Sequence, residues 1–353
     1  MTLYIGTYTQ AISEEIIGHG HGLYCFDFND HTGELSLRHT VPDTNPTYFC
    51  LSPHGRTLYA IQELAPPDHP QVSAYRIEDD ASLTLLNRQP IPGGHPCHIS
   101  LSEQSDYAVV SCYSSGHVLA YPVDDHGIAP LASSTQHAGH GPNPLRQEAP
   151  HPHQALFDTQ TQRWLVCDLG LDKVVYYPPG PPAASWLTST GHTPLPAGSG
   201  PRHLAFHPNG RHWLVLNELT ATVSVCHRPS GQVLGTYPTL PDDYSGLPHA
   251  AAIRISADGR FVYTSHRSDL NAIAISEFDP ATAALTLLTH TPTRGRTPRD
   301  FQLSPDGRWL IVANQDSDNL VVFRRDPTTG LLTPTTENTQ APTPVCLQWP
   351  PTP

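Results

Sequence analysis

Lysine is almost absent from this sequence. Lys173 is the only one among 353 residues, so the other basic side chains are arginines and histidines. We therefore expect no lysine Schiff base and no lysine nucleophile. Recognition of an anion must fall to arginine, whose planar guanidinium group suits carboxylate and phosphate. The formal net charge of −13 also argues against nucleic acid as a partner, because phosphate binding needs clustered cations.

Helical periodicity, long apolar runs and paired cysteines are missing as well. The chain is interrupted by 38 prolines and 25 glycines, and no apolar run approaches the roughly 20 residues of a membrane span. The strand pattern starts at Leu3, and we expect no signal peptide. The seven cysteines are scattered and form no CxxC pair, which argues against a disulfide framework or a zinc cluster. We expect no cofactor, no metal, no membrane association and a cytoplasmic location.

A strand–turn–strand unit recurs along the chain and is clearest at residues 200–218. Two short apolar segments, 204–206 and 213–216, flank a turn in which Pro208 has the fixed φ that suits the start of a type I turn. Gly210 takes a left-handed backbone at little cost. Related turns occur at residues 52–56, 256–260 and 304–308. The unit therefore predicts a β-hairpin that the chain repeats.

The repeat has a period of 46 to 56 residues. Its first strands open at Pro46, Pro96, Pro152, Pro201, Ala250, Pro298 and Pro344. Two more strands follow each hairpin, and four strands in such a period are typical of a β-propeller blade. Residues 345–349 form a first strand without partners, whereas residues 3–8, 22–28 and 35–39 lack a first strand. The sequence predicts one all-β domain over residues 1–353: a seven-bladed propeller whose last blade is closed by N- and C-terminal strands.

Equivalent positions of the repeat are expected to face the same axis. The residues after the strand-opening position are Thr47, Cys97, His153, Arg202, Ala251, Arg299 and Val345. The second strands end at Tyr8, Glu63, Tyr113, Leu169, Glu218, Arg267 and Gln315. If both sets share one mouth of the ring, a histidine, three arginines and two glutamates surround one cavity. Unpaired arginines indicate an anion receptor, although a structural ring of ion pairs would also explain them.

Residues 137–153 form the densest polar stretch and lengthen one interval of the repeat to 56 residues. Inserted loops on a rigid scaffold often carry function. His151 and His153 could be two metal ligands, but their neighbours offer no convincing third and fourth ligand, and solvated histidines without a role are another interpretation. Residues 14–21, which contain glutamates and histidines, are interpreted as a flexible loop.

Several segments resemble the lactonase family of seven-bladed propellers. They are residues 4–9 (YIGTYT), 141–153 (GPNPLRQEAPHPH), 200–203 (GPRH), 217–218 (NE), 298–300 (PRD) and 314–318 (NQDSD). The family includes the bacterial propeller-type 6-phosphogluconolactonases and the fungal 3-carboxy-cis,cis-muconate lactonizing enzymes. The resemblance spans essentially the whole chain and implies a metal-independent enzyme. Two positions depart from the family: Ala252 stands where glutamate is usual, and His266 where asparagine is usual.

The resemblance implies four catalytic residues, namely His153, Arg202, Glu218 and Arg267, with His151 as the alternative to His153. Lactone opening needs an activated water, and histidine is suited to that task near neutral pH. We expect Arg202 to stabilise the oxyanion, and Glu218 to orient His153 or the water, or simply to pair with Arg202. The expected substrate-binding residues are His98, Arg146, Glu148, His151, Arg299 and Asp300.

The function expected from this reading is hydrolysis of 6-phospho-D-glucono-1,5-lactone in the pentose phosphate pathway. The expected partner is a small anionic lactone, phosphorylated or carboxylated, and the chain is expected to be a monomer or a weak homo-oligomer. A carboxymuconate lactonizing cycloisomerase and a non-catalytic interaction propeller are the alternatives. A calcium-dependent propeller lactonase would need an acidic metal cage, which the sequence does not show.

Overall fold

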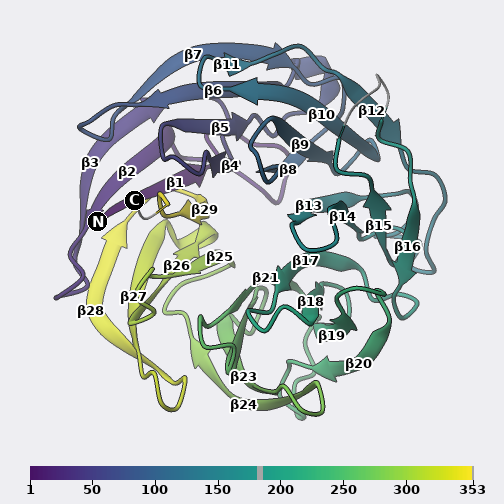
Figure 1. Cartoon of the computed structure of the whole chain (residues 1–353). Helices are drawn as coiled ribbons and strands as arrows, with labels where there is room; N and C mark the ends of the chain where they lie inside the picture. The colour runs from purple at the N-terminus through teal and green to yellow at the C-terminus, as the bar shows by residue number, and fades with distance from the viewer. Residues whose placement is uncertain (181–185, 352–353) are drawn as a thin grey trace.

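Seven antiparallel sheets surround a central axis in the computed structural model, which describes residues 1–180 and 186–351 (Figure 1). Each sheet is one blade, and within six of them the strands follow chain order from the axis outward. In the described residues, helical structure is limited to two 3₁₀ turns, η1 (Pro66–Asp68) and η2 (Gln315–Ser317). No helix of the described part is long and apolar enough to span a membrane.

The first three blades come from residues 48–194. Blade 1 contains β4 (Tyr48–Leu51), β5 (Thr57–Ile61), β6 (Gln71–Ile77) and β7 (Leu83–Pro90). Blade 2 contains β8 (Pro96–Leu101), β9 (Tyr107–Cys112) and β10 (His117–Asp124), with β11 (Gly127–Ile128) and β12 (Ser133–Gln136) sharing its outer edge. Blade 3 contains β13 (Pro152–Asp158), β14 (Arg163–Asp168), β15 (Lys173–Tyr177) and β16 (Gly191–Pro194).

The next three blades follow the predicted period. Blade 4 contains β17 (Pro201–Phe206), β18 (His212–Asn217), β19 (Thr222–His227) and β20 (Val233–Pro238). Blade 5 contains β21 (Ala250–Ile255), β22 (Phe261–His266), β23 (Ala272–Asp279) and β24 (Ala284–Pro292). Blade 6 contains β25 (Pro298–Leu303), β26 (Trp309–Asn314), β27 (Asn319–Arg325) and β28 (Leu332–Gln340).

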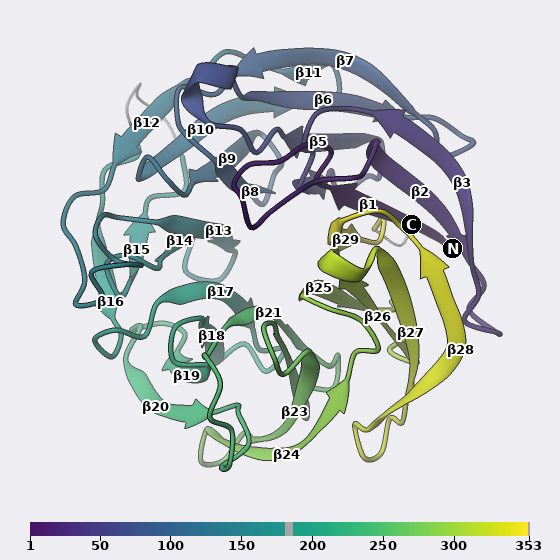
Figure 2. The ribbon, with the colours of Figure 1, turned by 180° about the vertical axis from the view of Figure 1, so that it is seen from behind.

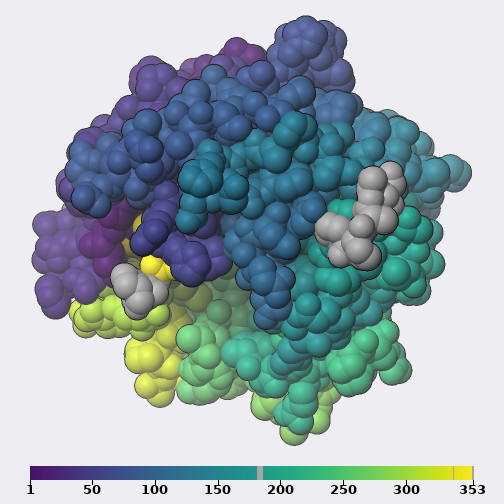
Figure 3. All heavy atoms as spheres, turned by 45° about the horizontal axis from the view of Figure 1, so that its top comes forward, coloured from purple at the N-terminus to yellow at the C-terminus, as the bar shows by residue number. Residues whose placement is uncertain are grey.

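Both ends of the chain build blade 7, as predicted. Its inner strand is β29 (Pro344–Gln348), followed outward by β1 (Thr2–Thr7), β2 (Gly22–Phe28) and β3 (Leu35–Pro42). Ile5 of β1 lies opposite Leu347 of β29 in the antiparallel ladder. N-terminal and C-terminal atoms accordingly lie side by side on the surface (Figure 3). This pairing closes the ring and leaves neither β1 nor β29 as an open edge.

The hairpin turns confirm the predicted turn chemistry. Strands β17 and β18 pair with Leu204 opposite Val215. Between them Gly210 has a φ of 70°, the left-handed conformation that glycine adopts without steric cost. The corresponding glycines of the three related turns, Gly55, Gly259 and Gly307, have φ values of 63°, 75° and 69°.

The apolar core consists of layers between neighbouring blades. Trp213 of blade 4, for example, is fully buried in a cluster with Leu165 of blade 3 and Val215 of its own blade. Both faces of each blade are covered in this way, so second strands such as β18 (HWLVLN) and β26 (WLIVAN) are mostly apolar. The innermost strands carry more polar residues, among them His153 and Arg202 at the axis.

We expect the closing strand to be essential for stability. A chain ending at Thr343 lacks β29, exposes β1 as an edge and loses the buried side chain of Leu347 and its neighbours. It should unfold at a much lower urea concentration than the full chain, or aggregate. A chain ending at Trp349 keeps β29 and the contact of Trp349 with Phe28 (ring centroids 5.3 Å apart), so it is the control. Equal unfolding midpoints for the two truncated chains would contradict this role.

Candidate active site

A β-bulge follows the strand-opening residue in six of the seven inner strands. The pairing skips Cys97, His153, Arg202, Arg299 and Val345 in five of them, and skips two residues in blade 5. A bulge takes a residue out of the regular pleat and re-aims its side chain. The five singly skipped residues and Thr47 line the central axis together. The predicted convergence of His153, Arg202 and Arg299 on the axis is thereby confirmed.

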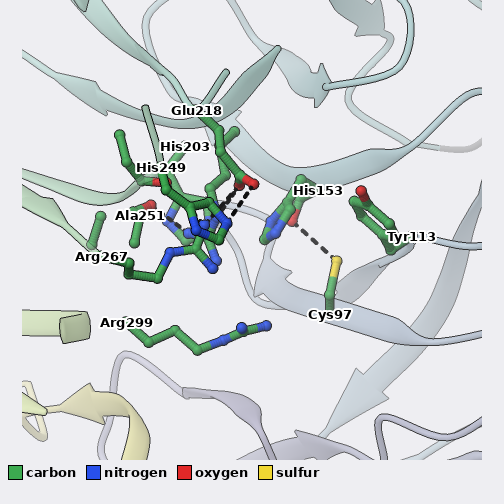
Figure 4. Close-up of polar contacts among 12 residues, drawn as sticks. Cys97, Tyr113, His153, His203, Glu218, His249, Ala251, Arg267 and Arg299 are labelled. Atoms are coloured by element: carbon green, nitrogen blue, oxygen red, sulfur yellow. Dashed lines mark hydrogen bonds and ion pairs between the residues drawn. The ribbon is translucent and has the colours of Figure 1, made fainter. Parts of the chain in front are cut away.

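A cavity of about 640 Å³ opens at one mouth of the axis. It is lined by six of the residues expected at the site: Arg146, His153, Arg202, Glu218, Arg267 and Arg299. The side chains of Arg267, Arg299 and His153 reach the same space from different blades (Figure 4). Second-strand ends such as Glu63 and Tyr113 also face the cavity, so both predicted sets of residues share one mouth.

One carboxylate, that of Glu218, organises the cavity. Its Oε1 atom lies 2.7 Å from Nη2 of Arg146 and 3.4 Å from Nε2 of His249. Its Oε2 atom lies 3.0 Å from Nε of Arg202 and 3.1 Å from Nη2 of Arg267. Glu218 follows β18, Arg202 lies on β17, Arg267 follows β22, and Arg146 comes from the inserted stretch before β13. Three arginines from separate segments are thus held by a single acidic group.

These contacts determine the charge state of Glu218. The side chain is buried, and burial alone would raise its pKa. The guanidinium of Arg267, with His249, Arg146 and Arg202, outweighs burial and lowers the pKa of Glu218 well below its ordinary value. The group is therefore a carboxylate at neutral pH.

Arginines outnumber the buried glutamates that line the cavity. Four arginines line the cavity together with two buried glutamates, Glu63 and Glu218. The acidic residues Glu15 and Asp316 also line it, but they are exposed at the rim. Burial, together with the neighbouring guanidinium groups, lowers the pKa of Arg267 to about 9.

Two guanidinium nitrogens of the cavity also form no hydrogen bond within the described part of the chain. Among the described residues, Nε of Arg267 has no hydrogen-bond partner, and Nε of Arg202, although 3.0 Å from Oε2 of Glu218, is likewise without one. Guanidinium groups with vacant N–H donors in a buried site are suited to an anionic ligand.

His153 lies on β13 with its side chain buried beside Arg202 and Arg299. Burial, and then the positive charge of Arg202, lowers its pKa well below the ordinary value, so the imidazole is neutral near pH 7. Its ring contacts His203 and Tyr113 edge-on, with centroids 5.1 and 5.8 Å away. Its Nδ1 atom has no partner in the described structure, and no hydrogen bond joins it to Glu218. Glu218 therefore holds the arginines directly and does not orient His153 by contact.

The structure places two expected residues of the inserted stretch outside the cavity. His151 stacks on Tyr113 with ring centroids 4.4 Å apart, and its Nδ1 atom lies 2.9 Å from the Tyr113 carbonyl oxygen. Glu148 is exposed and lies 3.2 Å from Nε2 of His151. Both nitrogens of His151 are therefore engaged, which leaves His153 as the histidine of this pair that faces the cavity.

Asp300 and His98 also lie away from the cavity. Asp300 binds Arg254 at 2.8 Å and accepts a hydrogen bond from the Leu347 amide at 3.0 Å, so it links blades 5, 6 and 7. His98 is buried against Tyr48 with ring centroids 4.3 Å apart. Each follows a bulged residue by one position. Asp300 lines a separate, narrow axial space with Arg202 and Arg299, whereas His98 packs against Tyr48 and His203.

The two departures from the family pattern do not alter the cavity wall. Ala252 packs in the apolar layer between blades 5 and 6. His266 is buried, with Nε2 3.0 Å from Oγ1 of Thr264. Neither residue lines the cavity.

Several residues that line the cavity were not predicted from the sequence. His249 immediately precedes β21 and touches Glu218. Ile12, Glu15 and Ile16 belong to the loop between β1 and β2, which was interpreted only as flexible. In the view from behind, this dark purple loop lies over the inner strands of blades 1 and 2, beside the centre of the ring (Figure 2). The position of His249 in the repeat, one residue before the strand opening, was the signal that could have identified it.

The fold and the site define a seven-bladed β-propeller with an arginine-rich axial cavity. The family model described as "Lactonase, 7-bladed beta-propeller" matches residues 2–349, and the chain belongs to this family. The family predicted from the sequence is thus confirmed.

Named relatives are similar over nearly their whole length. The chain is 33% identical to the 6-phosphogluconolactonase of Bacillus subtilis (strain 168), over 98% of this chain and 97% of that protein. It is 32% identical to the 6-phosphogluconolactonase of Formosa agariphila, over 94% of both chains. The solved structure of the periplasmic gluconolactonase of Pseudomonas aeruginosa superposes with a TM-score of 0.89 at 31% identity, covering 98% of each chain.

We expect Glu218→Gln to destabilise the protein by about 3–5 kcal/mol at pH 7, because it leaves buried arginines without their counter-charge. Folding lowers the pKa of Glu218, so its contribution is fully present above the unfolded value of about 4.5 and is lost as the pH falls through the folded value. The stability difference from wild type should therefore shrink below pH 4.5. Urea unfolding between pH 3 and pH 8 measures it.

The matched control is Glu148→Gln, since Glu148 is exposed and its partner is a histidine. Its unfolding free energy should change by less than about 0.5 kcal/mol. A Glu218→Gln protein as stable as wild type at pH 7 would show that the arginines do not depend on this carboxylate.

Proposed function

We propose that this protein hydrolyses 6-phospho-D-glucono-1,5-lactone to 6-phosphogluconate. The observation that carries the proposal is the convergence of four arginines and one neutral histidine on a single cavity with excess positive charge. The family membership and the relatives named 6-phosphogluconolactonase support it. A lactone bearing a phosphate group supplies both an ester carbonyl and the anion that such a cavity requires.

The hydrolytic step is assigned to His153. Its neutral imidazole accepts a proton from a water molecule as the water oxygen attacks the lactone carbonyl carbon. The carbonyl oxygen becomes an oxyanion, for which Arg202 provides a buried donor that is already fixed by Glu218 and by the carbonyl group of Ala251. The bond between the carbonyl carbon and the ring oxygen then breaks, and the ring oxygen takes the proton from His153. The products are a carboxylic acid and a hydroxyl group.

The remaining arginines are assigned to the anion. Arg146 is the most exposed of the four, with a side chain 38% accessible, and it reaches Glu218 from the inserted stretch. Arg299 donates to the Tyr8 hydroxyl at 3.0 Å and lies 4.0 Å from Glu63, so it is only weakly neutralised. Together with Arg267 they can hold a phosphate through charge-assisted hydrogen bonds.

We also propose that hydrolysis needs no bound metal and that it serves the pentose phosphate pathway in the cytoplasm. The residues assigned to the reaction are one histidine, one glutamate and arginines, and in the described part of the chain no three histidine, cysteine or acidic groups gather as metal ligands. The relatives named 6-phosphogluconolactonase support the assignment to this pathway.

His153→Ala should lower kcat/KM by about 10²–10⁴, the contribution typical of a general base, with the fold unchanged. Because burial and Arg202 keep the pKa of His153 well below 6.5, the wild-type rate should show no loss from its protonation between pH 8 and pH 6.5. A pH series of lactone hydrolysis, with circular dichroism of the variant, measures both. His151→Ala is the comparison, and its loss should be much smaller; unchanged turnover in His153→Ala removes that residue from the reaction.

A lactone panel tests the substrate. The wild-type kcat/KM should be about 10–100-fold higher for 6-phosphogluconolactone than for D-glucono-δ-lactone, as expected for charge-assisted hydrogen bonds to the phosphate. Arg146→Gln should reduce that preference, whereas Arg76→Gln, at an exposed arginine of blade 1, should not. A chelator should leave the rates unchanged.

The same experiment separates the alternatives. Loss of diene absorbance from carboxymuconate, without acid release from any lactone, would identify a cycloisomerase. The absence of both activities would favour an interaction propeller and would overturn the proposed hydrolysis.

A further inference from the structure

Three blades carry the same arrangement of polar side chains at the rim of the cavity. In each, the residue just before the first strand contacts the residue two positions after the end of the second strand. His95 Nδ1 lies 2.8 Å from Ser114 Oγ in blade 2, and His249 Nδ1 lies 3.0 Å from Ser268 Oγ in blade 5. In blade 6 the Thr297 hydroxyl donates to the Asp316 carboxylate. All six side chains line the cavity.

The backbone holds these pairs in equivalent places. The amide of Tyr113 donates to the His95 carbonyl oxygen, that of Arg267 to His249, and that of Gln315 to Thr297, each at 2.9 Å. The paired residues are therefore anchored where the two innermost strands meet. The corresponding positions of blade 4 are Gly200 and Leu219, which form no such pair. The polar pairs are thus a property of particular blades and are not required by the propeller.

The six paired residues are more accessible to solvent than the buried residues of the cavity. Arg202, Glu218 and His153 are buried, whereas the six paired residues are half-buried or exposed. His249 connects the two levels, since its Nε2 atom lies 3.4 Å from the Glu218 carboxylate. A ligand whose anionic group is bound by the arginines would therefore extend its remaining atoms past these pairs.

We propose that the pairs His95–Ser114, His249–Ser268 and Thr297–Asp316 form a collar that binds the hydroxyl groups of a polyhydroxylated lactone. This inference rests on the proposed function, since it concerns the same cavity. It assigns substrate specificity to six residues that lie outside the arginine and His153 set.

The chemistry of the collar fits hydroxyl groups better than a second anion. Serine and threonine hydroxyls both donate and accept, imidazole nitrogens can do either, and Asp316 only accepts. Sugar hydroxyls also donate and accept, so each pair can take one in a cooperative chain of hydrogen bonds. The carboxylate of Asp316 disfavours a phosphate at blade 6. The positive charge of Arg267, with burial, lowers the pKa of His249, so this imidazole offers no second cationic site near pH 7.

The test compares D-glucono-δ-lactone with δ-valerolactone, which has the same ring without hydroxyl groups. For wild type, Ser114→Ala, Ser268→Ala and Thr297→Val, the ratio of the two kcat/KM values is measured. Each variant should lower the ratio about 3–10-fold, the worth of one hydrogen bond in part-exposed surroundings. The matched control is Ser230→Ala, because Ser230 forms the same contact with His227 (Nδ1 to Oγ 2.8 Å) on the exposed outer part of blade 4.

The outcomes separate the collar from the proposed hydrolysis. Equal losses for both lactones, or an unchanged ratio in all three variants, overturn the collar. If wild type opens no lactone, hydrolysis fails while the collar is still judged by calorimetry with D-gluconate and hexanoate, which share one carboxylate and six carbons. Preference for gluconate that Ser268→Ala reduces supports the collar, and equal affinities overturn it.

Discussion

The ion-pair cluster around Glu218 is the interaction on which the site depends. Buried guanidinium groups are costly unless they are paired and hydrogen-bonded, and one carboxylate here serves Arg146, Arg202 and Arg267. Since these arginines come from three different segments, their planes are fixed relative to one another before any ligand arrives. The compensation is incomplete, because one negative charge faces three positive ones. A bound anion would supply the missing negative charge. The ion pairs that fix the arginines before binding therefore also leave the positive charge that attracts the anion.

The repeated bulge explains how such a cluster arises in a regular fold. An unbroken strand would turn its second residue toward the neighbouring blade, where a charge needs a buried partner, as Asp300 has in Arg254. The bulge instead directs Cys97, His153, Arg202 and Arg299 to the axis while the rest of each strand remains in the core. Each blade therefore offers one axial position without loss of its own stability. Only the residue type at that position decides whether a blade contributes chemistry or, like Val345, fills space.

The same geometry sets the limit of what the sequence could predict. Seven blades, the closing strand and five of the six cavity residues followed from the repeat, because equivalent sequence positions become equivalent positions in space. The sixth, Arg146, lies in the inserted stretch and was predicted from the family motif. Asp300 was predicted at the site from the family motif, and His98 from its place at a strand end. Regular pairing resumes after the bulge, however, and both lie outside the cavity, where Asp300 pairs with Arg254. The collar was missed because His249 and its counterparts precede the strands, and no strand pattern covers those positions.

The deep residues and the collar differ in how freely they can vary. Arg202 and Arg267 share the same carboxylate oxygen, Oε2 of Glu218, so a change at either alters the surroundings of the other. Contacting residues of this kind show strong energetic coupling. The collar pairs stand on separate blades, each anchored by its own backbone hydrogen bond, and only His249 touches Glu218. Substitutions in different pairs, such as Ser114 and Thr297, should therefore act independently, which makes the collar the part of the cavity where substrate range can change while the reaction chemistry is kept.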